Sequence, residues 1–209
     1  MKDTSGTKVL GRTSAKRLGL VLVPALAGAG VLGVMMANGA LAASFGVSGQ
    51  QFQLTATSIT GTKFAQFGSV DKIYVNGKYI PVAVSAFQNA TINGLCQSVE
   101  TDLSSYGLGN VWVVLKANSA SATNLVIDMQ QLNAGSADFT NINIGQDAST
   151  LDQGVAGAQG TPGLFGQQAD SAKLTNVSQV ANATNAGDFT LNGMSLSVST
   201  GNTDPCSAS

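Results

Sequence analysis

The sequence predicts an all-β protein, and two observations carry this prediction. Apolar residues alternate with Thr, Asn and Ser in many short runs, for example Ile73/Val75, Leu125/Ile127 and Phe189/Leu191. Such alternation places the apolar side chains on one face of a strand and the polar ones on the other. In addition, similar segments recur along the chain at a nearly fixed spacing, which is typical of repeating architectures.

Three segments take part in the recurrence. Residues 91–95 read TINGL and residues 190–194 read TLNGM, while residues 138–140 and 188–190 both read DFT. The threonines Thr91, Thr140 and Thr190 lie 49 and then 50 residues apart. A unit of this length with several short strands buries its apolar edges by stacking on neighbouring units. We therefore predict an irregular β-solenoid of about three units of ~50 residues, with a two-sheet β-sandwich as the alternative.

Local signals place several elements within this scheme. Asn76-Gly77 between β-forming residues favours a hairpin with a type I′ turn, because both central residues need positive φ. Pro81 cannot donate to a strand ladder and is expected at a strand end or edge. Residues 152–168 are rich in Gly and are expected to form a loop, with Leu164-Phe165 as its anchor in the core. Helix signals are weak, since the alanines of residues 117–122 and 169–183 stand among Ser, Thr and Asn.

The first 42 residues indicate export. Residues 1–17 carry a net charge of +4, residues 18–37 are uncharged, and Ala40-Leu41-Ala42 forms an A-x-A cleavage site. We interpret residues 1–42 as a signal peptide and residues 43–209 as the exported β-rich domain. The positive charge marks the cytoplasmic side, so this domain is expected outside the cytoplasm.

The alternative is a retained N-terminal hydrophobic helix that anchors the chain in the cytoplasmic membrane. Residues 18–37 would reach about 30 Å as a helix, which is enough to span a bilayer. Small residues at four-residue spacing would then form a helix-packing stripe, namely Ala25, Ala29, Gly33 and Ala37.

The two cysteines, Cys96 and Cys206, are predicted to form a disulfide, because an even cysteine count in an exported protein indicates pairing. Two unpaired thiols are the alternative. The sequence has no histidine and no C-x-x-C pair, so we expect no metal site and no cofactor. After residue 17 the net charge is −5 and no arginine occurs, which excludes the basic face that nucleic-acid binding requires.

The absence of histidine rules out a Ser-His-Asp or Cys-His catalytic unit within the chain, and no G-x-S-x-G motif occurs. Ser69 and Lys72 match the S-x-x-K spacing of serine–lysine acyl enzymes and are the only nameable catalytic candidates. Lys72 leads directly into a predicted strand, where residues i and i+3 point to opposite faces, so we interpret the pair as a solvated turn. Two acidic pairs have the residue types of a glycosidase, but we interpret them as turn and cap residues: Glu100/Asp102 and Asp138/Asp188.

Three stretches carry a resemblance to a known family: residues 43–50 (ASFGVSGQ), 95–99 (LCQSV) and 186–191 (AGDFTL). Here the chain resembles an exported actinobacterial family of unknown function, and the resemblance covers nearly the whole chain, leader included. Some members of that family carry an automatic label of cholesterol esterase, which implies hydrolysis of a sterol ester. No catalytic motif accompanies the resemblance, so no catalytic residue is carried over.

These observations favour a secreted or envelope-associated, non-catalytic β-rich protein that is structural or binds a partner. A lipid, an envelope protein or a second copy of the chain is the expected partner. Two alternatives stay open. One is a lipid or cholesterol ester hydrolase without a histidine triad, and the other is a membrane-anchored assembly subunit.

Overall fold

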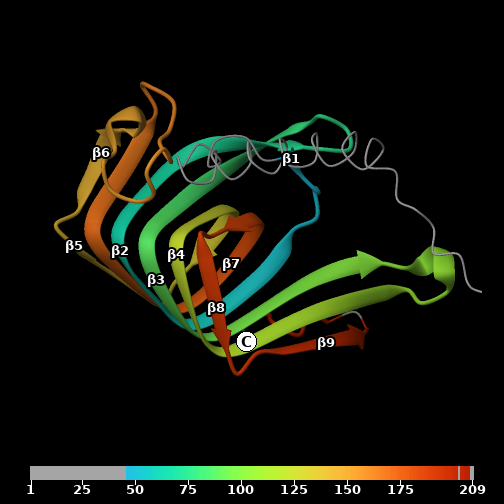
Figure 1. Ribbon diagram of the computed structural model, residues 1–209. Coiled ribbons are helices and arrows are strands. Elements are labelled where there is room, and N and C mark those ends of the chain that lie inside the picture. Colours follow the sequence, from blue (N-terminus) through green and yellow to red (C-terminus); the bar gives the residue numbers. More distant parts are fainter. Residues whose placement is uncertain (1–45, 202, 208–209) are drawn as a thin grey trace, which may run out of the picture. The chain divides into compact units, whose positions relative to one another are not determined.

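A computed structural model describes residues 46–201 and 203–207, and these residues form one β-sheet unit, which confirms the all-β prediction (Figure 1). All the paired strands are antiparallel except the short β1, which runs parallel to β2. The described residues also include two short 3₁₀ helices, η2 (Ser104–Tyr106) and η3 (Ala148–Thr150). The strands are β1 (Gly46–Val47), β2 (Phe52–Ile73), β3 (Tyr79–Asp102), β4 (Asn110–Asn133), β5 (Ser136–Thr140), β6 (Asn143–Asp147), β7 (Phe165–Asn185), β8 (Asp188–Asn192) and β9 (Ser195–Thr200).

The predicted leader lies outside the described residues. Its hydrophobic helix, its cleavage site and the stripe of Ala25, Ala29, Gly33 and Ala37 therefore remain predictions. Within the described part of the chain, no helix is long and apolar enough to cross a bilayer.

The topology of the sheet differs from the stack of coils that the recurrence suggested. β2, β3 and β4 pair along almost their full lengths as consecutive hairpins. β7 pairs with β4 over residues 178–185 and with β2 over residues 177–181, so the pairing closes the circuit β2–β3–β4–β7–β2. β5 and β6 add to β7, and β8 and β9 add to β4. This is a single antiparallel sheet rather than a clear solenoid or two separate sheets.

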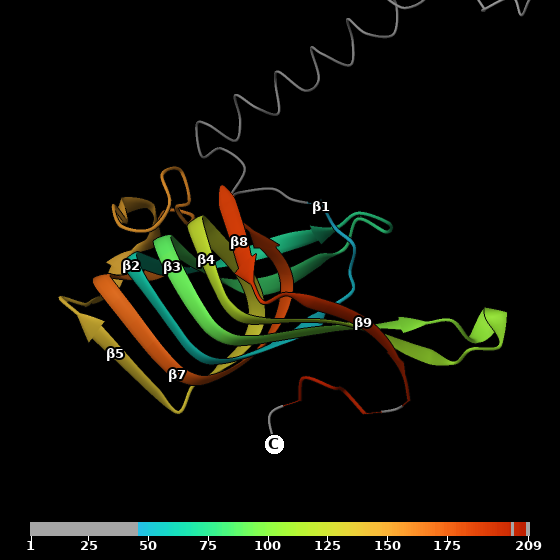
Figure 2. The ribbon, with the colours of Figure 1, turned by 60° about the horizontal axis from the view of Figure 1, so that its bottom comes forward.

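Sharp bends divide the long strands (Figures 1 and 2). Six five-residue stretches, which we call the central segments, each end immediately before a residue with positive φ. Asn and Gly are the residue types that adopt this conformation most readily, and they occupy five of these six positions. The segments and their following residues are 58–62 with Lys63 (φ 54°), 89–93 with Gly94 (63°), 119–123 with Asn124 (49°), 136–140 with Asn141 (52°), 171–175 with Asn176 (48°) and 188–192 with Gly193 (64°).

Each bend also shifts the inward alternation by one residue. On β4, Ala120 and Ala122 are buried before the bend, whereas Leu125 and Ile127 are buried after it. A continuous strand therefore resembles several short ones in sequence, which is why short strands were predicted.

The bend at Asn124 gives a testable prediction. Asn124→Val should lower the free energy of unfolding by about 1–2 kcal/mol relative to Asn124→Gly, because a β-branched residue is strained at positive φ. Urea unfolding of the two variants measures the difference. Ser197→Val on β9 is the control and should stay close to wild type, since Ser197 has no positive φ. Equal stability of the Val and Gly variants at position 124 would contradict this account of the bend.

Two apolar clusters stabilise the sheet. The larger one gathers inward residues of β2, β3, β4 and β7, including Ile59, Phe87, Leu125 and Met129. The smaller one lies on the opposite face of the sheet, where Phe67 and Val84 pack with Leu151 and Ala158 of the loop that follows β6. Other large members are Leu54, Phe64, Ile92, Leu174 and Val177 in the larger cluster, and Val82 and Val126 in the smaller one.

The predicted loop is present but shorter than expected, because residues 165–168 belong to β7, and its predicted anchor is wrong. Leu164 and Phe165 are 48% and 58% exposed, while Leu151 and Ala158 are each 1% exposed. The glycines of the loop let its backbone approach the sheet closely. A Cβ on Gly154 would lie 2.8 Å from Cβ of Ala65, so a small residue is required there.

The hairpin between β2 and β3 is present, but its turn is not the predicted type I′. Five residues connect the strands, and of Asn76 and Gly77 only Gly77 has positive φ. Pro81 pairs with Val70 of β2 at a point that β4 does not reach, since the pairing of β3 with β4 begins at Ala83. The alanine-rich residues 117–122 and 169–183 lie in strands, where small side chains pack inward.

Candidate functional site: a polar sheet face

The six central segments lie side by side in the order β5, β7, β2, β3, β4, β8 (Figure 2). The second and fourth residues are buried in the four inner segments, and the fourth residues of the outer segments, Phe139 on β5 and Leu191 on β8, pack against the larger apolar cluster. The first, third and fifth residues face outward and are Ser, Thr, Asn, Asp or Lys throughout. The local sequence explains this placement, because period-two alternation runs between two bends.

The register of β2, β3, β4 and β8 aligns their outward residues in three straight rows of four. With strands about 4.8 Å apart, each row is about 14 Å long. We call these twelve residues the polar array. Its central row is Thr60, Thr91, Ser121 and Thr190, and its flanking rows are Ser58, Asn93, Ser119, Asn192 and Thr62, Asn89, Thr123, Asp188.

Hydrogen bonds fix the side chains of the flanking rows. Nδ2 of Asn93 donates to Oγ of Ser58 over 3.1 Å, and Nδ2 of Asn192 donates to the neighbouring Ser119 over 3.3 Å. Oγ1 of Thr123 donates to Oδ2 of Asp188 over 2.9 Å. The four hydroxyls of the central row, in contrast, bond to no other described side chain, so they remain available to a ligand.

A shallow groove of about 460 Å³ lies over the central row and the flanking row that ends in Asp188. Its walls combine hydroxyl and amide side chains with small residues beneath them. The array contains one carboxylate, no cationic side chain and no aromatic ring, so it can donate and accept many hydrogen bonds but offers little charge. The groove is lined by Thr60, Gly61, Thr62, Asn89, Ala90, Thr91, Ser121, Ala122, Thr123, Asp188 and Thr190.

A buried acidic pair lies away from this face. Asp71 on β2 and Asp128 on β4 are 7% and 5% exposed and are hydrogen-bonded to each other. Nδ2 of Asn182 donates to Oδ2 of Asp71 over 3.4 Å, and Oδ1 of Asp128 has no hydrogen-bond partner among the described residues. Burial, the negative charge of Asp71 and their hydrogen bond raise the pKa of Asp128 to about 7. Burial also raises the pKa of Asp71, although hydrogen bonds from Asn182 and Asp128 oppose it.

This pair was not predicted from the sequence, although a signal was present. Asp128 interrupts the apolar run from Leu125 to Met129 at a position where an acid is costly to bury. Within the described residues, no group of three His, Cys, Asp or Glu side chains gathers, at this pair or elsewhere.

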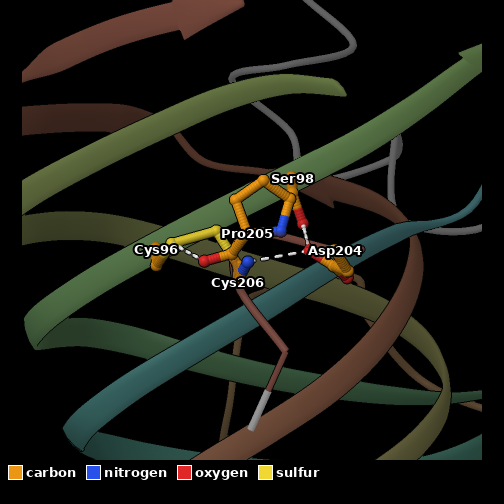
Figure 3. Close-up of a disulfide and its surroundings, with 5 residues drawn as sticks. All are labelled: Cys96, Ser98, Asp204, Pro205 and Cys206. Atoms are coloured by element: carbon orange, nitrogen blue, oxygen red, sulfur yellow. Dashed lines mark hydrogen bonds between the residues drawn. A yellow bond between two sulfur atoms is a disulfide. The ribbon is translucent and has the colours of Figure 1, made fainter. Parts of the chain in front are cut away.

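The predicted disulfide between Cys96 and Cys206 is present, with an Sγ–Sγ distance of 2.02 Å (Figure 3). It ties the C-terminal tail to β3. Asp204 supports the same junction, because its Oδ1 accepts hydrogen bonds from the backbone N of Cys206 and from the buried hydroxyl of Ser98. Such a bond is compatible with an exported protein.

The structure does not bring the catalytic candidates together. Ser69 and Lys72 both lie within β2, three residues apart, so their side chains point to opposite faces rather than forming a turn. Asp102 accepts hydrogen bonds from the side chain and backbone of Ser104, which lower its pKa, while Glu100 accepts one from Asn110 over 2.6 Å.

Asp138 and Asp188 are also separated. They lie on β5 and β8, the two outermost strands of the central segments (Figure 2). They occupy the third and the first position of their segments, so the matching DFT letters are displaced by two residues in the structure.

The protein is an all-β protein with a disulfide between Cys96 and Cys206, and its candidate functional site is the polar array on one face of the sheet. A model for a family of unknown function (DUF6230) matches residues 48–207, and the chain belongs to this family. This agrees with the resemblance to a family of unknown function and assigns no activity. No curated protein and no solved structure matches the chain.

Proposed function

We propose that the protein is exported and acts at the cell envelope or outside the cell by binding, not by catalysis. The polar array is the observation that carries this proposal. It is an ordered surface with fixed flanking rows and an available central row of hydroxyls. The disulfide and the signal-like leader support export.

Lipid contact is a second candidate, and it would use the outside of the molecule. The cavity within the larger apolar cluster measures about 40 Å³, far below the roughly 300–1,000 Å³ of ligand pockets. Exposed apolar side chains gather instead at the hairpin between β2 and β3, where Tyr74, Val75 and Tyr79 are 83%, 83% and 66% exposed. Contact with a lipid or an envelope protein through this hairpin would fit their chemistry.

A hydrolysis assay tests the non-catalytic part of the proposal. Full-length protein is expressed in an exporting bacterium, recovered, and assayed with cholesteryl and p-nitrophenyl esters. We expect no turnover above a heat-denatured sample, and no difference between wild type, Ser69→Ala and the surface control Ser197→Ala. Robust turnover that Ser69→Ala or Lys72→Ala abolishes would overturn the proposal in favour of an ester hydrolase.

Cell fractionation and intact mass test the export. Loss of the mass of residues 1–42 would indicate a cleaved leader, whereas the intact chain in the membrane fraction would indicate the anchored alternative. Protein confined to the cytoplasm would contradict export in either form.

A further inference from the structure

We infer that the polar array binds an uncharged polysaccharide chain, which lies across the strands along the central row. This inference rests on the proposed binding function and names the chemical class of its ligand.

The side-chain chemistry of the array selects the ligand class. Eleven of its twelve residues are Ser, Thr or Asn, and the single acid, Asp188, already accepts a hydrogen bond from Thr123. Without a cationic side chain, the array cannot offset the charge of an anionic polymer. Without a large apolar side chain, it has little to gain from covering a lipid. Hydroxyls and amides both donate and accept, which matches the hydroxyls of a sugar.

The arrangement of the array favours a chain over a single sugar. Each neutral hydrogen bond contributes little net free energy, because it replaces a hydrogen bond to water. Useful affinity therefore requires many of them at once. The central row offers one unbonded hydroxyl per strand over about 14 Å, and the groove follows the same four strands. A polymer with regularly spaced hydroxyls can engage the whole row, and the fixed flanking rows reduce the ordering that binding requires.

The boundaries of the array define the expected footprint. On the far side of β2, the third residues of the β7 and β5 segments are Lys173 and Asp138, which pair in register. The surface therefore becomes charged on passing from β2 to β7. On the other side β8 is the edge strand. Between β2 and β8 the array therefore carries a single charged side chain, Asp188, and the ligand is expected to cover this span. Regular rows of hydroxyls could instead order water at the surface of ice, which is flat. The groove over the central row fits a polymer chain better than such a flat surface.

Sedimentation with insoluble polysaccharides tests the inference. The exported full-length protein is mixed with chitin, cellulose and starch granules, and the bound fraction is measured over a range of polysaccharide concentrations. We expect retention by at least one of them, with little loss in 1 M NaCl because no charge pairs are involved. Thr91→Val/Ser121→Ala removes two central hydroxyls with no added bulk and should weaken retention at least tenfold.

Ser197→Ala/Thr200→Val is the matched control, because it removes two exposed hydroxyls of β9 outside the array. It should bind as wild type does, and circular dichroism and thermal unfolding should show that both double variants are folded. The inference is overturned if no polysaccharide retains the protein, if both double variants bind equally, or if salt releases it. Inhibition of ice growth without retention would overturn it in favour of ordered water as the ligand. None of these outcomes affects the proposed export and lack of turnover, which separate assays measure.

Discussion

The Cys96→Ala/Cys206→Ala protein should unfold with a free energy about 3–4 kcal/mol lower than that of wild type. The disulfide joins residues 110 positions apart, and closing so long a loop removes much entropy from the unfolded chain. The chain-entropy model gives about 4.7 kcal/mol for a loop near this length, and measured gains are usually smaller. The same bond holds Asp204 beside Ser98, so its loss should also loosen the tail that follows β9.

Urea unfolding under non-reducing conditions measures this effect. Wild type unfolded with a reductant is the control and should approach the stability of the double variant. A difference of less than about 1 kcal/mol between oxidised wild type and the variant would contradict the role assigned to the bond.

Stability should fall as the pH rises from about 4 to about 7, because of Asp128. In the folded protein its pKa is about 7, whereas its ordinary value is 3.8. Between these values the folded state holds a proton that the unfolded state releases, so a higher pH favours unfolding. The stabilisation is complete below the unfolded value and is lost as the pH passes through the folded one. The total loss is on the order of 4 kcal/mol, and the raised pKa of Asp71 acts in the same direction.

Asp128→Asn should remove most of this dependence and should be more stable than wild type at pH 8, because a neutral amide replaces the buried charge. Urea unfolding at pH 4, 5.5, 7 and 8 provides the profile. Asp138→Asn, on the exposed face of β5, is the control and should keep the wild-type slope. A free energy of unfolding that stays level or rises between pH 4 and pH 7 in the wild type would contradict the raised pKa of Asp128.

The all-β class and the disulfide were predictable from sequence because each depends on a local or compositional signal. The closed circuit of strands was not, because each bend resets the alternation that reveals a strand. The hexapeptides SITGTK, NATING, SASATN, SADFTN, SAKLTN and DFTLNG share a polar–apolar rhythm that ends in a residue with positive φ, and they would have located the bends.

The recurrence at residues 91 and 190 has a structural counterpart that differs from stacked coils. Thr91, Ile92 and Asn93 of β3 pair with residues 119–121 of β4 on one side, and residues 190–192 of β8 pair with the same three on the other. The two similar segments thus share one partner strand. The segment around Thr140 pairs with β7 instead, so the three segments do not form one stack.

The candidate site was harder to predict than the fold. The outward Thr, Asn and Ser residues were recognisable as surface positions, but their rows depend on the register between strands distant in sequence. The acidic pair joins Asp71 and Asp128 from different strands, and their contact depends on the bending of the whole sheet. Neither relation is encoded within a short window of sequence.

Binding of a polysaccharide to the polar array can be followed through the methyl resonances of threonine. Protein carrying ¹³C-methyl threonine is titrated with soluble fragments of the polysaccharide that retains it. We expect the signals of Thr60, Thr91 and Thr190 to shift, while those of Thr101 and Thr200 stay unchanged. Shifts confined to threonines outside the array, or no shift at saturating ligand, would contradict the account.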